Sequence, residues 1–235
     1  NFTVEEKTPN DVDVSLDPEL LGRVFENLLA AFNPETRENA RKATGSFYTP
    51  RPIVGYMVNE SLVQYLKTKV VGGEGLEEEF RKLISYQEEE TNLLDVQKKD
   101  ILHCLYTCKI LDPACGSGAF PMGMLQQMVH IMKQLDPDNS IWHEVVLEEA
   151  ERETMDALKN EKDKDAREKR LLEINEDFEN DLTYPDYKRK LHLIKNCIYG
   201  VDIQPIAMMI SKLRFFISLV CEQEVDKDAP EKNYG

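Results

Sequence analysis

The sequence predicts an α/β protein, and two stretches of the chain carry this prediction. In the first, the short strand Lys109-Ile-Leu111 is followed by the loop Asp112-Pro-Ala-Cys-Gly-Ser-Gly118 and then by apolar residues at helical spacing. In the second, Cys197-Ile-Tyr-Gly-Val201 ends in Asp202 and leads into another helical pattern. A strand, a tight glycine loop and a helix form the first half of a β-α-β unit. We therefore expect part of an open α/β sheet, with helices packed beside it.

The N-terminal segments are predicted to be a polar lead and one helix. Residues 1–16 are polar and are expected to be disordered or to form a linker. Asp17-Pro-Glu19 opens a helix, because Asp is a favoured N-cap and Pro fits the first turn. Its apolar spacing ends near Asn33-Pro34, and a polar loop follows as far as Thr44-Gly-Ser46.

Further helices are predicted before the first strand. One begins near Pro52 and runs to about Lys69, with apolar positions at Ile53, Tyr56, Met57, Leu62 and Tyr65. Residues 76–104 have the pattern of one or two short amphipathic helices. We assign residues 17–108 to an N-terminal helical region.

The second region, residues 109–225, contains both strands and a long interruption. A helix is predicted from Ala119 to about Leu135, and another from about Pro205 to Cys221. Residues 136–190 are treated as an insertion, because in an uninterrupted β-α-β unit the acid after the second strand comes roughly 20 residues on, and Asp202 comes much later. Within them, the charge-dense run from Glu144 to Asp181 has few aromatics. Such a run is most simply a solvated helical hairpin, and a partner-binding role is the alternative. Residues 226–235 form a polar tail.

Charge and cysteine content restrict the class of protein. The net charge is −15, which makes a poor surface for a phosphate backbone, because DNA affinity comes largely from Lys and Arg. The five cysteines are odd in number, and Cys104 and Cys108 have no ligand-spaced partner pair, which disfavours zinc and favours free thiols in a reducing cytoplasm. No segment is apolar enough for a membrane span, and no signal-peptide pattern is present. The chain starts without Met and ends in a polar run, as an excised portion of a longer polypeptide would.

The loop from Asp112 to Gly118 is the strongest chemical signal. Gly116 and Gly118 permit backbone angles that side chains disfavour and let a ligand approach the main chain. The helix that follows offers free N–H groups, and this edge of an open α/β sheet is a usual ligand site. The spacing is not the dinucleotide fingerprint, because position 121 is Pro, and no Gly-Lys-Ser/Thr makes it a P-loop. Glycines of an ordinary turn remain the alternative.

Asp202 strengthens the ligand reading. An acid at the end of the second strand can accept hydrogen bonds from both hydroxyls of a ribose. Taken alone, Asp202 could equally be a strand-end or helix-capping residue. Together with the glycine loop, the ribose reading is favoured.

These residues resemble a known family. Asp112-Pro-Ala-Cys-Gly-Ser-Gly-Ala-Phe120 resembles motif I of gamma-class amino-group DNA methyltransferases, Gly45-Ser-Phe-Tyr-Thr-Pro50 resembles their motif X, and Tyr199-Gly-Val-Asp-Ile-Gln-Pro205 resembles motif II. The order X, I, II is that of the gamma class. The similarity is greatest to Eco57I-like enzymes, type IIG restriction–modification proteins and phage-defence methylases, over residues 16–220. Asp17–Phe25 and Ser211–Ile217 also resemble that group.

The resemblance implies a partial Rossmann-like methyltransferase sheet that binds S-adenosyl-L-methionine. It assigns Thr49 and Pro50 to the methionine end of the cofactor, with Tyr48 packed nearby, and Asp202 to the ribose, with Ile203 on the adenine face. The residues around the methionine moiety would be Asp112, Ala114, Cys115, Gly116 and Gly118, with Phe120 lining the same pocket. Asp112 would lie near the cofactor's ammonium, as electrostatics also favours. Cys115 as a nucleophile is disfavoured, since it lies in the cofactor loop.

One element of the family is absent from these 235 residues. The catalytic Asn-Pro-Pro-Tyr/Phe motif does not occur, because Asn33-Pro34 is followed by Glu and Thr and precedes motif I. In the family, this motif binds and stacks on an adenine turned out of the duplex. We therefore expect the cofactor-binding portion of a DNA adenine-N6 methyltransferase that is inactive alone. Its partners would be double-stranded DNA, held by other regions, and the rest of its polypeptide, including a target-recognition domain and, in some members, a nuclease.

Two rival functions remain open at this stage. One is a Rossmann-like methyltransferase that acts on RNA or protein, against which the position of motif X ahead of motif I argues. The other is a non-enzymatic partner-binding module built on residues 136–190. Binding of the cofactor discriminates between an enzyme portion and such a module.

Overall fold

The computed structural model describes residues 24, 49–73, 75–87 and 89–222. The predicted segment 1–16, the polar loop, Tyr48 and the tail 226–235 therefore lie outside the described residues. So does the predicted helix from Asp17, except Val24, which is helical and exposed.

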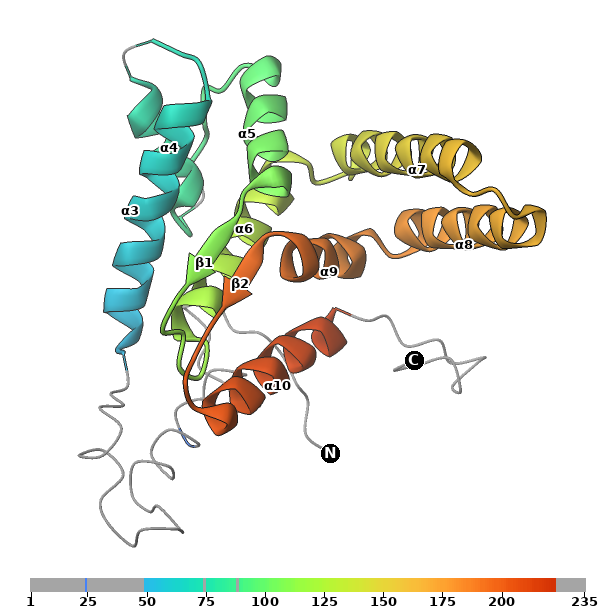
Figure 1. Cartoon of the computed structure of the whole chain (residues 1–235). Coiled ribbons are helices and arrows are strands. Elements are labelled where there is room, and N and C mark those ends of the chain that lie inside the picture. The colour runs from blue at the N-terminus through green and yellow to red at the C-terminus, as the bar shows by residue number, and fades with distance from the viewer. Residues whose placement is uncertain (1–23, 25–48, 74, 88, 223–235) are drawn as a thin grey trace, which may run out of the picture.

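The described chain is built mainly of helices around two short strands (Figure 1). Before the first strand come α3 (Arg51–Lys69), α4 (Leu76–Ile84) and α5 (Asp95–Thr107). Strand β1 (Ile110–Asp112) is followed by α6 (Ala119–Leu135), α7 (Ser140–Asn160), α8 (Lys164–Thr183) and α9 (Pro185–Asn196). Strand β2 (Ile198–Gly200) and α10 (Pro205–Cys221) complete the described order. The predicted limits of α6 and α10 agree with the structure, and two helices, α4 and α5, cover the region predicted to hold one or two.

The two strands pair in parallel, with Ile110 opposite Ile198. The pairing extends past the strand ends, because the Val201 N–H donates to the Asp112 carbonyl at 2.9 Å and the Cys115 N–H donates to the Val201 carbonyl at 3.0 Å. The chain between the strands is helical, so this is one β-α-β unit. The wider Rossmann-like sheet and the division of the chain into domains stay predictions.

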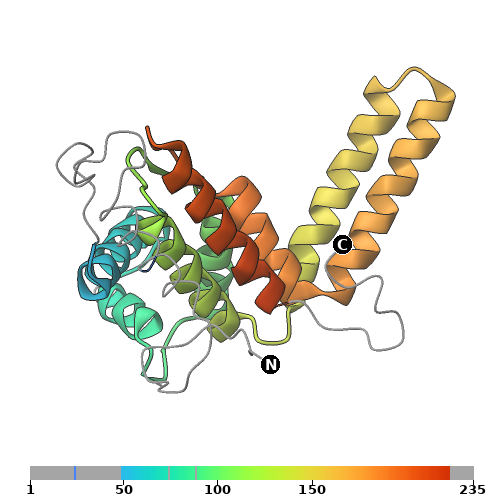
Figure 2. The ribbon, with the colours of Figure 1, turned by 90° about the horizontal axis from the view of Figure 1, so that it is seen from below.

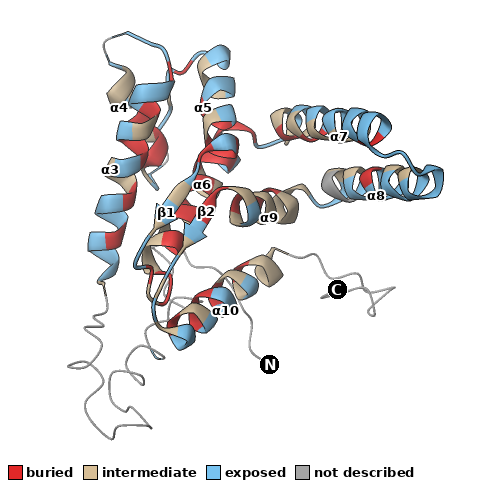
Figure 3. Ribbon diagram, viewed as in Figure 1, coloured by how far each residue is buried: buried red, intermediate tan, exposed pale blue. Residues whose placement is uncertain are grey.

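Helix α6 is the centre of the main core. Leu125, Met128, Ile131 and Met132 on α6 are fully buried, and α3, α4, α5 and α9 all pack against this helix. Figure 3 shows the buried residues following this inner seam while the outer faces of α3, α7 and α8 are exposed. The glycine loop is therefore joined directly to the best-packed helix of the described chain.

The face of α3 that enters the core agrees with the predicted apolar positions at Leu62, which is buried, and at Tyr65, which packs against the core, but not at the other three. Ile53, Tyr56 and Met57 are exposed, whereas Val54 and Val58 are buried. Helix α3 carries apolar residues on more than one side, so periodicity alone does not fix the inward face. The partner fixes it, since a Cβ on Gly123 of α6 would lie only 2.8 Å from Val54 Cγ1.

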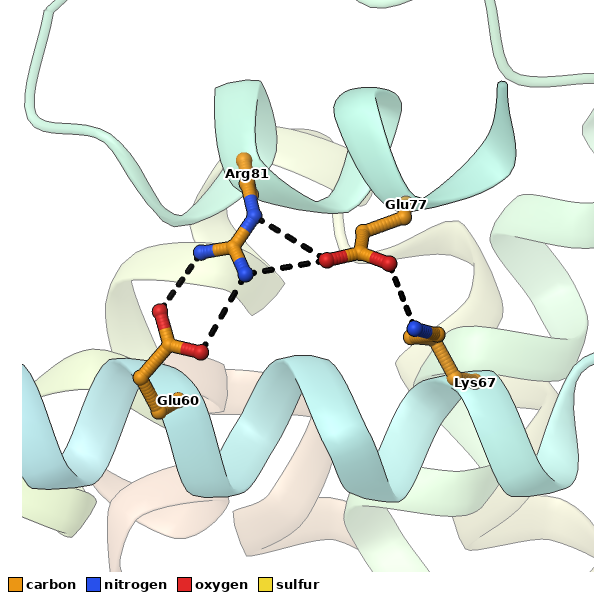
Figure 4. A network of polar contacts seen from close by, with 4 residues as sticks. All are labelled: Glu60, Lys67, Glu77 and Arg81. Atoms are coloured by element: carbon orange, nitrogen blue, oxygen red, sulfur yellow. Dashed lines mark hydrogen bonds and ion pairs between the residues drawn. The ribbon is translucent and has the colours of Figure 1, made fainter.

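A chain of ion pairs joins α3 to α4 on the surface (Figure 4). The Arg81 guanidinium donates to both Glu60 oxygens, at 2.6 and 3.1 Å, and to Glu77, and Lys67 bonds the other Glu77 oxygen. The hydrogen bond from Arg81 holds the pKa of Glu60 below its usual value. The bonds from Lys67 and Arg81 do the same to the pKa of Glu77.

Helices α7 and α8 lie side by side and project from the body (Figures 1 and 2). A buried pair closes the root of this hairpin, where Arg189 of α9 bonds the carboxylate and the carbonyl of Asp136. The same carboxylate accepts the N–H groups of Ile141 and Trp142, both at 3.0 Å, at the start of α7. None of the helices described is long and apolar enough to cross a membrane.

Candidate functional site

The loop after β1 turns the chain into α6 within six residues. Gly116 and Gly118 have φ angles of 55° and 85°, in the left-handed region that glycine adopts without strain. The Gly118 N–H donates to the Cys115 carbonyl at 2.8 Å, and the Gly118 carbonyl accepts the Met122 N–H at 2.9 Å, which is the first hydrogen bond of α6. The loop is thus a tight turn that leads directly into the helix N-terminus.

Asp112 is the last residue of β1, and only one of its two carboxylate oxygens has a hydrogen-bond partner in the described part of the chain. Its Oδ1 accepts the Ala114 N–H at 3.1 Å. Its Oδ2 is buried and has no hydrogen-bond partner in the described part of the chain. A buried carboxylate oxygen without a partner is costly. Asp112 is therefore ready to accept a hydrogen bond from a cationic ligand group.

Asp202 joins the second strand to the same loop. Its Oδ2 accepts the Gly116 N–H at 3.0 Å, and its Oδ1 accepts the Gln204 N–H at 2.8 Å. Each carboxylate oxygen has a second lone pair, so these bonds leave room to accept ligand hydroxyls. The structure thus brings the two predicted acids, Asp112 and Asp202, to one glycine turn. Ile203, the next residue, is 91% exposed and free to cover a ligand.

Cys115 is buried at the centre of the turn. Its Sγ lies 3.6 Å from Met208 Sδ of α10. Burial raises the pKa of the Cys115 thiol, and the neighbouring charges of Asp112 and Asp202 raise it further. The thiol is therefore protonated near neutral pH. This environment does not fit a nucleophile, which needs the thiolate.

Helix α10 holds the loop from the other side. The Arg214 guanidinium donates to the Ser117 carbonyl at 2.9 Å, and both residues are buried. Ser211 lies against the turn so closely that a Cβ on Gly118 would be 2.4 Å from its Oγ. The sequence assigned no role to Ser211 or Arg214. The available signal was polar residues within an otherwise apolar helix.

Among the described residues, Thr49, Pro50 and Phe120 make no hydrogen bond to this turn. Figure 1 shows the N-terminal end of α3 at the same end of the molecule as the glycine loop. Pro50 caps α3, its carbonyl accepting the Ile53 N–H at 3.0 Å, and Thr49 is half-buried. No hydrogen bond within residues 49–73 and 89–222 joins Thr49 to the loop. Phe120 packs against the main core, and Tyr48 is outside the described residues.

The described residues contain no group of three or more His, Cys, Asp or Glu side chains arranged to hold a metal ion. The chemistry available at the turn is thus two carboxylates, backbone N–H groups and an apolar edge. Two carboxylates at one turn are suited to a ligand that is cationic at one end and carries hydroxyls.

Comparison with known proteins gives one informative relative. No protein-family model matches the chain, and no solved structure matches it. The chain is 28% identical over 222 residues to a Methanocaldococcus jannaschii protein, named as a predicted type II restriction enzyme and methyltransferase. The matched region covers 91% of this chain and 15% of that protein. Because only about a tenth of the chain lies outside the match, the similarity includes the glycine loop.

Proposed function

We propose that this chain is the S-adenosyl-L-methionine-binding portion of a restriction–modification DNA methyltransferase. The convergence of Asp112 and Asp202 on one glycine turn carries the proposal, because their bonds link the ends of two paired strands. The relative supports a methyltransferase of the restriction–modification type. The order of the three motifs supports the finer assignment to a gamma-class, Eco57I-like, adenine-N6 enzyme.

The residues present fit the cofactor. The buried, unpartnered Oδ2 of Asp112 would accept the ammonium of the methionine moiety. Asp202 would accept the ribose hydroxyls while still holding Gly116, and exposed Ile203 would pack on the adenine. The backbone of Gly116 and Gly118, free of side chains, would let the methionine chain approach. Thr49 and Pro50, with Tyr48, would close the methionine end.

When bound, the cofactor supplies a methyl group on a cationic sulfur. The group that would receive this methyl is adenine N6. The chain's own residues hold and orient the donor. Presentation of the adenine is assigned to an Asn-Pro-Pro-Tyr/Phe motif elsewhere in the polypeptide, since these 235 residues contain none. We therefore propose that this portion binds the cofactor and does not transfer the methyl group by itself.

The substrate follows from the same division of roles. The net charge of −15 argues that double-stranded DNA is held by other regions of the polypeptide. A target-recognition domain and the rest of the methylase domain would be partners within one protein. The sheet of the complete enzyme is proposed to be Rossmann-like, with β1 and β2 as two of its strands.

Calorimetry with S-adenosyl-L-methionine tests this function. We expect measurable binding by the chain, a loss of about tenfold or more for Asp112→Asn, and a comparable loss for Asp202→Asn, since each removes a charge-assisted bond. Asp165→Asn, on exposed α8, is the matched control and should bind as the parent does. Absence of binding heat at high cofactor concentration would overturn the proposal.

The division of roles has its own measurement. Incubation with duplex DNA and isotopically labelled cofactor should give no methylated adenine with residues 1–235 alone. Appearance of N6-methyladenine would contradict the assignment of adenine presentation to another segment. It would leave the cofactor site itself intact.

A further inference from the structure

The hairpin formed by α7 and α8 has charge of opposite sign at its two ends. Its root, residues 144–156 and 173–181, carries eleven acids and one base, Arg152. Its tip, residues 159–170, carries six bases and four acids. The hairpin, which projects from the body in Figure 2, is therefore strongly negative where it leaves the body and net positive where it ends.

The charge order along α8 opposes the dipole of that helix. Lys164, Arg167, Lys169 and Arg170 occupy its N-terminal half, and the last turn has no basic residue. A helix is stabilised by acids at its N-terminus and bases at its C-terminus. Lys164 and Lys169 pair with Glu168 and Glu173 within α8, but complementarity to the helix dipole does not account for this charge order. An external partner would account for it.

Several charges at both ends lack an ion pair within the hairpin. Among the described residues, no salt bridge reaches Lys159, Lys162 or Arg167 at the tip, or Glu148 and Glu151 near the root. Other hairpin charges are satisfied internally, as Arg170 is by Glu153 at 2.7 Å. The unpaired charges are available for contacts outside this copy of the chain.

The outer face of α7 adds an apolar stripe between these charges. Leu147, Met155 and Leu158 are 48%, 68% and 51% exposed. Their spacing of eight and three residues puts them on one side of the helix. The opposite side of α7 is occupied by α8, with Val146 and Ala157 buried. Single exposed apolar residues are ordinary, but an aligned set on a charged projecting helix indicates a contact surface.

We propose that this hairpin binds the same hairpin of a second copy of the chain, antiparallel and around a two-fold axis. In that arrangement Leu147 lies opposite Leu158 of the second copy, and Met155 lies near the axis. Lys159 then falls level with the stretch from Glu144 to Glu148 of the second copy, so tip and root charges pair at both ends. A two-fold contact uses one patch twice and requires such self-complementarity.

A second copy fits these observations better than DNA does. A nucleic acid would be repelled by the eleven root acids and would leave the apolar stripe uncovered. A second hairpin covers the stripe and matches both signs of charge. Three apolar side chains per copy make a small interface, so the dimer should be concentration-dependent and sensitive to salt.

Sedimentation equilibrium of residues 1–235 tests the proposal by charge reversal. The parent chain should approach twice its monomer mass as concentration rises at low salt, and should dissociate at high salt. Lys159→Glu with Lys162→Glu should raise the dissociation constant about tenfold or more, because each substitution acts twice across the axis. Glu144→Lys with Glu148→Lys should do the same, because these two acids lie level with Lys159 and Lys162 of the second copy. Met155→Glu, within the stripe, should also abolish association.

Combining the tip and root reversals, which restores opposite charges across the contact, is the decisive experiment. The chain with all four reversals should dimerise as the parent does, and the two doubly reversed chains should form a mixed dimer with each other. Lys98→Glu with Lys212→Glu changes the net charge equally, off the hairpin, and should leave association unchanged. Circular dichroism of each variant checks that it is folded.

Two results would overturn the proposal. One is a chain that stays monomeric at every concentration at low salt. The other is a dimer that survives the tip reversal, or that the four reversals together do not restore. A monomer whose retention on DNA is lost on tip reversal would assign the tip to nucleic acid instead of to a second copy.

Discussion

The carboxylate of Asp202 accepts the backbone N–H of Gly116 at 3.0 Å, although 86 residues separate the two in sequence. This bond ties the end of β2 to the turn after β1. The two halves of the candidate site are thus held in register by the protein itself and not only by a ligand. The acid proposed to bind the ribose is therefore also a structural acid.

Replacing Asp202 should therefore reduce stability as well as affinity. Asp202→Ala leaves the Gly116 and Gln204 N–H groups without their acceptor, and we expect the free energy of unfolding to fall by about 1–3 kcal/mol. Urea unfolding without cofactor measures this directly. Glu176→Ala, an exposed acid on α8, is the control. Unchanged stability in Asp202→Ala would mean that the Gly116 bond contributes nothing net.

Gly118 should be intolerant of any side chain. Gly118→Ala meets two obstacles, a φ angle of 85° and a Cβ position 2.4 Å from Ser211 Oγ. We expect a loss of about 1–3 kcal/mol in stability and weaker cofactor binding. Gly73→Ala, whose new Cβ would meet nothing within 4 Å, should stay within about 0.5 kcal/mol of the parent. Equal effects of the two substitutions would contradict the close approach of α10.

The buried pair at the hairpin root should be the most sensitive ion pair of the described chain. Arg189→Met leaves the fully buried Asp136 carboxylate without its cation, which should cost about 3–5 kcal/mol. Arg152→Met removes an exposed arginine and should cost less than about 0.5 kcal/mol. Hydrogen exchange should show faster exchange at the start of α7 in Arg189→Met. Slow exchange there would show that Asp136 caps α7 without help from Arg189.

The carboxyl of Glu222 should make part of the folding stability sensitive to acid. Burial by itself raises the pKa of this carboxyl, but the charges of Lys190 and Lys133 outweigh burial and hold the pKa below its usual 4.5. A carboxyl with a depressed folded pKa contributes stability above its unfolded pKa and loses it as pH falls through the folded pKa. Stability of the parent should therefore fall from about pH 4.5 downwards more steeply than that of Glu222→Gln. Parallel pH profiles for the two chains would contradict this role.

Local residue signals predicted the limits of several elements. Gly118 ends the loop where α6 begins, and Pro205 stands in the first turn of α10. The acids of the site could be identified from their position after short apolar strands. These features depend on neighbours within a few residues, which is why sequence reasoning reaches them.

Other features depend on partners far apart in the chain. The inward face of α3 is set by Gly123 on α6, and the ion pair between Asp136 and Arg189 joins residues 53 positions apart. The bond from Arg214 to Ser117 spans 97 residues. No local periodicity encodes such contacts, because each requires both helices to be in place before the two groups meet.

The ion pair between Asp136 and Arg189, at the base of the hairpin, affects how the chain tolerates changes in length. The ion pair between Asp136 and Arg189 holds together the two ends of the segment that contains α7 and α8. The connection from α6 to β2 therefore does not depend on the length of that segment. Insertion or removal of whole helical turns in α7 and α8 changes only the length of the hairpin. The spacing between Asp112 and Asp202 is therefore independent of the length of the hairpin, and either feature can change without the other.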